Sequence, residues 1–536
     1  MSKEIKFKSK IFILAIIVLN CLMILGGSLS VFAVNVQEEL VIPLVGGDWG
    51  FPDPFVHQPR DWGGVYTTLI FDTLVEEDEI GIIPWLAVDW ELKEGGKLYN
   101  FKLRKNVKWQ DGEDFNADDV VFTINYYKEK NNYLYDLSNI SSINKINDYC
   151  VEFIMNEASV VDLYTTFKGI HIIPKHIWKD VEDPRQFHVN NPRKALIGTG
   201  PYILEDYQKE HGTYCFISNK NFWDGKPVVD KIITIPTGNP VLSLLKGEIA
   251  ITMISPQEID AFKNNSDFVI KELKPYHNKW LCFNLNDLHL KKTKFRYAIA
   301  HAINKQELLN RLNKGVGKLG SQGGLPRVHP MYNPNIKSYD YNPERANNLL
   351  TKLGYKDVNG DGYREDADGN KLQFTILTMG HNVRGAELVQ LQLKKVGINT
   401  EIRANNRNTI DDLTRQGKFQ IVYQMGGYGG LSGDPDLLRS NFSSDIKRSS
   451  FFAAYRYENA EFNKLAEQQK SETDPELRKD LIFKMQEIVA EDIPLYYLYG
   501  QGGYYVYNKN IYDGWFYPVS APLLDRSKLE YCRGKK

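Results

Sequence analysis

Oxygen-bearing side chains recur at close intervals in residues 357–368, which read DVNGDGYREDAD. They stand at positions 1, 3, 5, 9 and 12 of this segment, with glycine at position 6, as do the ligands of a calcium-binding loop. The residues concerned are Asp357, Asn359, Asp361, Glu365 and Asp368. Position 12 is aspartate rather than the bidentate glutamate, and no helix pair is evident on either side. We therefore expect a solvated hairpin that binds no metal, with calcium binding as the alternative.

A glycine-rich stretch follows an apolar strand that begins at Phe419. Glycines leave backbone groups open to a ligand, and an extended peptide can pair with such an edge whatever its sequence. The predicted ligand contacts of this stretch are Met425, Gly427, Tyr428, Gly429, Gly430, Leu431, Ser432, Asp434 and Asp436. The alternative is a loop that needs its glycines only for tight turning and its aspartates only to cap a helix.

Residue patterns typical of enzymes are absent from the sequence. It has no nucleophile elbow, Walker loop, HExxH motif or dinucleotide fingerprint. His171, His176 and His188 are irregularly spaced and have no fixed carboxylate partner, so they do not predict a metal site. These absences agree with a binding protein that needs neither catalytic residues nor a cofactor. A hydrolase or peptidase is the alternative, and it would need a nucleophile–base pair or a metal cluster facing its substrate.

The strands and helices that would position the candidate ligand contacts are predicted most clearly in residues 72–127. Apolar and polar residues alternate over 99–104, which predicts a strand with one buried face. Asn116 can cap a helix whose first turn carries Asp118 and Asp119. Strands predicted at 374–378 and 400–403 alternate with helices near 385–396 and 408–416, which indicates an α/β domain.

The same segments resemble a known family, the family 5 extracellular solute-binding proteins, which are receptors of oligopeptide, dipeptide and nickel importers. The matching residues are PWLA at 84–87, Trp90, FKLR at 101–104, VKW at 107–109, DG at 111–112, ADDV at 117–120, GTGPY at 198–202, NFWDGKP at 221–227, VLSLLKGEI at 241–249 and FRYAIAHAINK at 295–305. The resemblance therefore covers nearly the whole chain.

This resemblance implies a two-lobed α/β fold of the periplasmic-binding-protein type, class II, in its large three-domain variant with two hinge crossings. We expect lobe I at 34–76 and 197–276 with its accessory subdomain at 77–196, lobe II at 277–503, and a C-terminal part of lobe I at 504–536. It also implies that the loop after the first strand lies at the cleft between the lobes. The candidate ligand contacts there are Trp49, Phe51, Arg60, Trp62 and Tyr66, with His57 beside them. The alternative is that these side chains dock on their own domain.

The resemblance does not settle the cargo. In peptide receptors of this family a carboxylate of the glycine-rich loop pairs with the ligand amino group, and the residue we align with that carboxylate is Leu431. Either Asp434 or Asp436 replaces it, or the ligand is not a peptide. We expect a peptide, and keep an oligosaccharide or a nickel chelate open. Delivery to a membrane permease is expected; presentation of the ligand to a surface kinase is the alternative.

Composition and the amino terminus agree with an exported receptor. The 536 residues are too many for one core, and a formal net charge of −1 gives no electrostatic case for nucleic acid. The resemblance implies that the partners are a small solute and an ABC permease, and we expect a monomer. Residues 1–33 have a basic start and an apolar run, which predicts a signal peptide cleaved after Ala33. Asn20 before Cys21 argues against lipidation, and Asn20 also breaks an apolar run that is short for a membrane anchor. The remaining cysteines have no CxxC spacing and predict no zinc site.

Overall fold

The computed structural model describes residues 38–44, 48–57, 62–426, 434–444, 456–518, 524 and 527–534. The chain divides into the units Met1–Val36 and Gln37–Lys536, and every described residue belongs to the second. The predicted signal peptide therefore lies outside the described residues. Among the residues described, none of the helices combines the length and the apolar character needed to cross a membrane.

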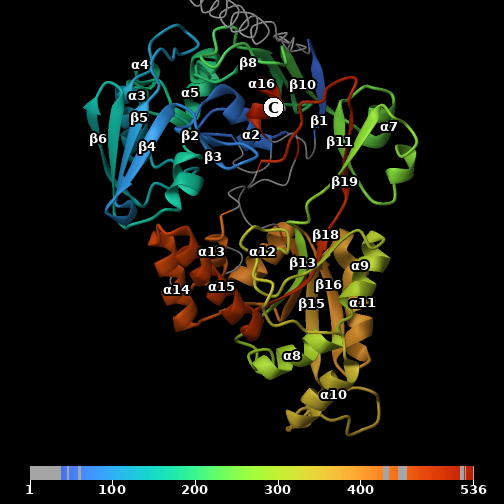
Figure 1. The fold of residues 1–536 in the computed structure, drawn as a ribbon. Helices are drawn as coiled ribbons and strands as arrows, with labels where there is room; N and C mark the ends of the chain where they lie inside the picture. The colour runs from blue at the N-terminus through green and yellow to red at the C-terminus, as the bar shows by residue number, and fades with distance from the viewer. Residues whose placement is uncertain are drawn as a thin grey trace, which may run out of the picture. The chain divides into compact units, whose positions relative to one another are not determined.

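Two four-stranded sheets are built mainly from the first half of the chain (Figure 1). The first has the order β1 (Leu40–Leu44), β10 (Lys231–Pro236), β9 (Thr213–Ser218) and β8 (Tyr202–Gln208). The second has the order β4 (Ala87–Lys93), β5 (Leu98–Leu103), β7 (Cys150–Met155) and β6 (Ile140–Asn147). Only β1 and β10 run parallel; their register places Leu40 opposite Ile232. A short pair, β2 (Val75–Glu77) and β3 (Ile82–Pro84), stands apart from both sheets.

The helix predicted after residue 116 is present as α3 (Ala117–Glu129). Asn116 and Asp119 form a capping box, so each side chain satisfies a backbone N–H at the helix start. The strand predicted at 99–104 is β5, in which Tyr99, Phe101 and Leu103 are buried. The other helices of this half are α2 (Trp62–Ile70), η1 (Glu94–Gly96), the π-helix η2 (Leu163–Phe167), α4 (Lys175–Trp178), α5 (Pro184–Asn190) and α6 (Pro192–Ala195).

A six-stranded mixed sheet holds the second half of the chain. Its order is β14 (Gly317–Leu319), β18 (Leu495–Gln501), β13 (Asn278–Phe283), β17 (Ile421–Gly426), β15 (Gln373–Met379) and β16 (Asn399–Asn405). Its helices are α8 (Thr293–Ala302), α9 (Lys305–Asn313), α10 (Pro343–Lys352), η4 (Gly380–Asn382), α11 (Val383–Lys394), α12 (Arg407–Arg415), α13 (Leu437–Phe442), α14 (Ala460–Ser471) and α15 (Pro475–Asp492). The strands predicted at 374–378 and 400–403 and the helices predicted near 385–396 and 408–416 are β15, β16, α11 and α12.

The chain passes between this sheet and a three-stranded sheet twice. The smaller sheet has the order β11 (Ile251–Ile254), β19 (Tyr504–Asn508) and β12 (Phe268–Glu272), and α7 (Pro240–Leu245) and η3 (Ile259–Ala261) accompany it. One passage joins β12 to β13 and the other joins β18 to β19. The two passages are hydrogen-bonded to each other: Leu273 N donates to Gly503 O, and Gln501 N donates to His277 O, each at 2.9 Å. The domain boundaries given above remain a prediction.

The close approach of the two passages explains why residue 500 is a glycine. A Cβ built on Gly500 would lie 2.8 Å from the backbone oxygen of Pro275, nearer than such atoms come in proteins. Residue 500 must therefore lack a side chain for β18 to lie this close to the passage before β13. The four described cysteines, Cys150, Cys215, Cys282 and Cys532, are free thiols.

Asp72 is the best-connected buried charge in the part of the chain that holds the first sheets. It follows α2, is 0% exposed, and accepts hydrogen bonds from residues far apart in the sequence. The donors are Trp85 Nε1 at 2.6 Å, Trp223 Nε1 at 3.0 Å, Thr199 Oγ1 at 2.9 Å and Lys528 Nζ at 2.8 Å. Lys528 lies on α16 (Lys528–Cys532) and also pairs with Glu76 at 2.7 Å. The C-terminal helix is thus fixed by an ion pair from which solvent is excluded.

Removal of the Lys528 charge should destabilise the protein strongly. In Lys528→Met two buried carboxylates lose their cation, and loss of one partner of a buried ion pair costs about 3–5 kcal/mol. Urea unfolding followed by intrinsic tryptophan fluorescence measures the change, and Trp85 and Trp223, which bond to Asp72, contribute to that signal.

The control is Lys226→Met, which removes a half-exposed ion pair with Asp230 at 2.9 Å. Exposed pairs contribute about 0–1 kcal/mol. Equal unfolding free energies for the two variants would contradict a structural role for the buried pair.

Candidate ligand-binding site

The aromatic loop, residues 48–57, is held on the first sheet by Asp48. The Asp48 Oδ1 atom accepts hydrogen bonds from Tyr207 OH at 2.8 Å, Tyr214 OH at 2.9 Å and Gly50 N at 3.0 Å. Trp49 N in turn donates to Tyr214 OH at 3.0 Å. Both Trp49 and Phe51 are half-buried. The loop therefore presents two aromatic side chains from a backbone that is fixed by hydrogen bonds.

The other end of the loop is anchored by Asp53, which is fully buried. Its Oδ1 accepts from Phe55 N at 2.7 Å and Val56 N at 3.1 Å. Its Oδ2 lies 3.5 Å from His188 Nδ1, and neither atom has a hydrogen-bond partner among the described residues. Burial raises the pKa of Asp53 to about 7 and lowers the pKa of His57 to about 4. The Asp53 side chain that anchors this end of the loop is thus costly to ionise.

The other candidates near this loop differ in their surroundings. Tyr66 on α2 is buried, with its ring centroid 4.3 Å from that of Tyr214, so it packs in the core beneath the loop. Phe51 stacks on His188 at 5.1 Å between centroids. Trp62 begins α2, and Arg60 lies outside the described residues.

The pKa of Asp53 predicts a measurable pH dependence of stability. Between about pH 4 and pH 7 the native carboxyl keeps a proton that the unfolded chain has lost, so the free energy of unfolding falls as pH rises. The amide introduced by Asp53→Asn cannot ionise, but its oxygen can still accept from Phe55 N and Val56 N.

The difference in unfolding free energy between Asp53→Asn and wild type should therefore grow with pH in this range. The expected slope is up to about 1.4 kcal/mol per pH unit, from the free energy of one proton. Urea titrations at several pH values measure it, and the comparison of the two proteins cancels the opposite contribution of His57. A difference that does not change with pH would show that Asp53 is ionised at its ordinary pKa.

In the second half of the chain the candidate residues begin at the end of β17. Met425 is half-buried and lies opposite Lys279 of β13 in the register of the sheet. Residues Gly427, Tyr428, Gly429, Gly430, Leu431 and Ser432 lie outside the described residues.

Asp434 and Asp436 are both buried and engaged by cations. Arg478 donates to Asp434 Oδ1 at 2.8 Å and to Oδ2 at 3.0 Å, which is the bidentate geometry of a strong pair. Asp436 accepts from Arg439 twice, at 2.7 Å each, and from Gln469 Nε2 at 2.5 Å. These contacts tie the start of α13 to α14 and α15. Most acceptor positions of these two carboxylates are therefore already occupied.

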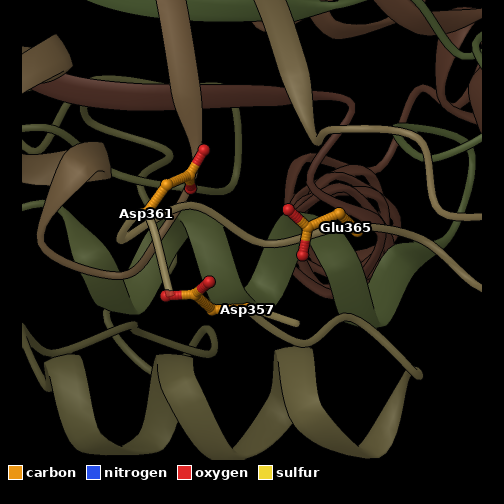
Figure 2. Close-up of side chains that lie close together, drawn as sticks. All are labelled: Asp357, Asp361 and Glu365. Carbon is orange, nitrogen blue, oxygen red and sulfur yellow. The ribbon is translucent and has the colours of Figure 1, made fainter. Parts of the chain in front are cut away.

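The acidic segment 357–368 brings together three of the four carboxylates of the calcium pattern (Figure 2). Carboxylate oxygens of Asp357, Asp361 and Glu365 lie within 4.8 Å of one another. Each already has a donor: Gly360 N bonds to Asp357 at 2.7 Å, Val358 N bonds to Glu365 at 2.8 Å, and Lys371 Nζ pairs with Asp361 at 2.7 Å. Lys371 already occupies one oxygen of Asp361, and the absence of a metal here stays a prediction. The carboxylate of Asp368 is not among the three that lie together.

One polar residue of the large sheet was not singled out from the sequence. Every residue of β13, NKWLCF, is buried, and Lys279 is the only charged one. A lysine within an apolar strand is itself a signal, because lysine is almost never fully buried unless it is paired.

Comparison with known proteins identifies the family. Residues 81–449 match the model of the bacterial extracellular solute-binding proteins, family 5 Middle. The chain belongs to this family. Family 5 proteins are solute-binding receptors of ABC importers rather than enzymes, and they are exported to the periplasm or the cell surface.

Two relatives illustrate the match to family 5. The oligopeptide-binding protein AppA of Bacillus subtilis is 27% identical over 505 residues, which cover 90% of this chain and 91% of AppA. Its solved structure, in complex with a nonapeptide, has a TM-score of 0.73 at 24% identity and covers 91% and 97% of the two chains. NikZ of Campylobacter jejuni, in complex with Ni(L-His), has a TM-score of 0.72 at 25% identity, with 89% and 94% covered. The predicted fold class, the two-lobed α/β fold of periplasmic binding proteins, is confirmed.

Proposed function

We propose that this family 5 receptor binds peptides and hands them unaltered to a membrane permease. The observation that carries the proposal is its likeness over nine-tenths of its length to an oligopeptide-binding protein. The sequence after β17 adds support. Residues 427–433 are rich in glycine, and glycine lets a ligand backbone approach the main chain.

The proposed ligand contacts come from both halves of the chain. From the first half we propose Trp49 and Phe51, which are half-buried, together with Arg60 and Trp62. Tyr66 is buried, so we propose that it supports the loop from below rather than touching the ligand. From the second half we propose Met425, Gly427, Tyr428, Gly429, Gly430, Leu431, Ser432, Asp434 and Asp436. Burial of the ligand between such groups provides specificity without chemistry. We further propose that the exported receptor acts as a monomer.

Native mass spectrometry of the protein purified without added ligand tests the cargo directly. Peptides released on denaturation support the proposal, whereas a sugar or a nickel complex would replace the peptide by another solute of the same receptor class. Peptide added to the pure protein must be recovered intact. Multiple-turnover cleavage would instead show a peptidase.

Recognition of the peptide amino group should be weak in this receptor. Leu431 cannot pair with an ammonium group, and Asp434 and Asp436 already bond to arginines. Acetylation of a bound peptide's amino terminus should therefore change its Kd by less than about tenfold, or about 1.4 kcal/mol.

Isothermal titration calorimetry with the free and acetylated forms of one co-purified peptide measures this ratio. A loss of affinity of about 100-fold, or about 2.7 kcal/mol, would mean that a carboxylate does hold the amino group.

A further inference from the structure

A hydrogen-bonded contact joins the two halves of the chain at a place other than the two passages. Lys470, on α14, bonds to the segment that follows β7. Its Nζ donates to Glu157 Oε2 at 2.5 Å, and its carbonyl oxygen accepts from Val160 N at 2.9 Å. Figure 1 shows α14 on the left of the large sheet and the passage from β18 to β19 on the right. The contact is therefore distinct from the passages that connect the sheets covalently.

The segment that carries Glu157 is fixed by its own hydrogen bonds. Glu157 N donates to Asn139 Oδ1 at 3.0 Å, and Asn139 Nδ2 donates to Glu157 O at 3.2 Å. Ser159 N donates to Gly96 O at 3.3 Å. A Cβ built on Gly96 would lie 2.6 Å from Ser159 O, so residue 96 must be glycine for the two backbones to approach this closely. None of these bonds involves Lys470, so the first half of the chain fixes the backbone of Glu157 by itself.

Lys470 is held in place by the contacts of its neighbour on α14. Gln469 is 0% exposed, donates to Asp436 Oδ1 at 2.5 Å and accepts from Arg478 Nη2 at 3.0 Å. These bonds fix the end of α14 against α13 and α15. A lysine near the C-terminal end of a helix is also favoured by the helix dipole. Glu467, one turn earlier, lies 3.9 Å from Lys470 Nζ, farther than Glu157 does.

The main-chain bond takes the place of a helix cap. The last four carbonyl groups of an α-helix have no N–H partner within the helix, and Lys470 is the penultimate residue of α14. Its carbonyl accepts from Val160 N, which belongs to the other half of the chain. The first half of the chain thus completes a helix of the second half with one neutral hydrogen bond and one charged hydrogen bond.

We propose that Glu157, Val160 and Lys470 form a latch that holds the lobes of this receptor together when they are closed. Two-lobed receptors close by hinge motion, and a rotation about the two passages breaks a contact that lies away from them. On the predicted boundaries, Glu157 and Val160 belong to the accessory subdomain of lobe I, and Lys470 belongs to lobe II. The inference goes beyond the proposed function, because it does not depend on which solute is bound.

The ion pair of the latch is open to solvent from one side. The side chain of Glu157 is 67% exposed, whereas that of Lys470 is 12% exposed. The hydrogen bond from Lys470 lowers the pKa of Glu157, and the charge of Arg439 acts in the same direction, so the carboxylate is ionised at neutral pH. Pairs that water reaches are screened by salt and contribute little. Such a latch shifts the balance between the open and closed forms and still lets the solute leave.

Hydrogen exchange measured by mass spectrometry tests whether the latch forms in solution. The amide of Val160 should be protected in wild type, because it donates to Lys470 O. Glu157→Gln keeps the size of the side chain and removes its charge. It should speed exchange at Val160 by up to about fivefold, which corresponds to about 1 kcal/mol. Lys470→Met, which removes the other charge of the pair, should have the same effect.

The control is Lys464→Met, which removes a charge from the same helix. Lys464 is exposed and has no ion pair in the described part of the chain. Exchange at Val160 in this variant should equal that of wild type. An equal increase in Lys464→Met and Lys470→Met would overturn the latch, because the effect would then come from the charge of the helix and not from the contact.

Small-angle X-ray scattering tests the consequence for the lobes. The protein is measured as purified and after removal of bound solute, at about 0.01 M and about 1 M salt, where the Debye length is about 30 Å and about 3 Å. Wild type should become more open at high salt. Glu157→Gln should already be more open than wild type at low salt, and it should respond less to added salt.

Two results would overturn the latch. One is exchange and scattering that are the same in wild type, Glu157→Gln and Lys470→Met. The other is faster exchange in the variants without a more open form, because the contact would then not hold the lobes together. Either result leaves the peptide proposal intact, since that proposal is tested on the bound solute.

Discussion

The ion pair between Asp72 and Lys528 connects the segment after α2 to the C-terminal helix, and the arrangement of the first sheets depends on it. Asp72 follows α2, which the aromatic loop precedes, while Lys528 belongs to the last helix. Two indoles and a threonine complete the environment of the carboxylate. A buried carboxylate is tolerated only when its oxygens are satisfied in this way. The C-terminal helix, although only five residues long, is therefore part of the scaffold that supports the aromatic loop.

Local patterns were sufficient to predict the regular elements. The alternation at 99–104 and the Asn116 cap give β5 and α3, because each depends only on neighbouring residues. The family resemblance gave the fold class, since many short motifs occur in the right order. The partners of Asp72 could not be predicted, because they lie 13 to 456 residues away from it in sequence. Such pairings are fixed by the packing of whole sheets.

The candidate site shows the same division. The glycine-rich stretch and the family resemblance predicted where a ligand binds, but not which side chains are free to bind it. Tyr66 packs in the core, and Asp434 and Asp436 bond to arginines. These contacts cannot be inferred from the residue type alone. Lys279 was overlooked although a lysine within an apolar strand is itself a signal.

Buried charges thus fall into two kinds in this protein. Asp434 and Arg478 are both buried, and their paired geometry compensates the loss of hydration. That pair fixes helices to one another and leaves nothing for a ligand to complete. Lys279 has one neutral partner among the described residues, and its buried charge weakens the empty protein. The compensated pairs therefore describe the scaffold, whereas a charge buried without a counter-charge costs stability, which is why such groups are rare in folded proteins.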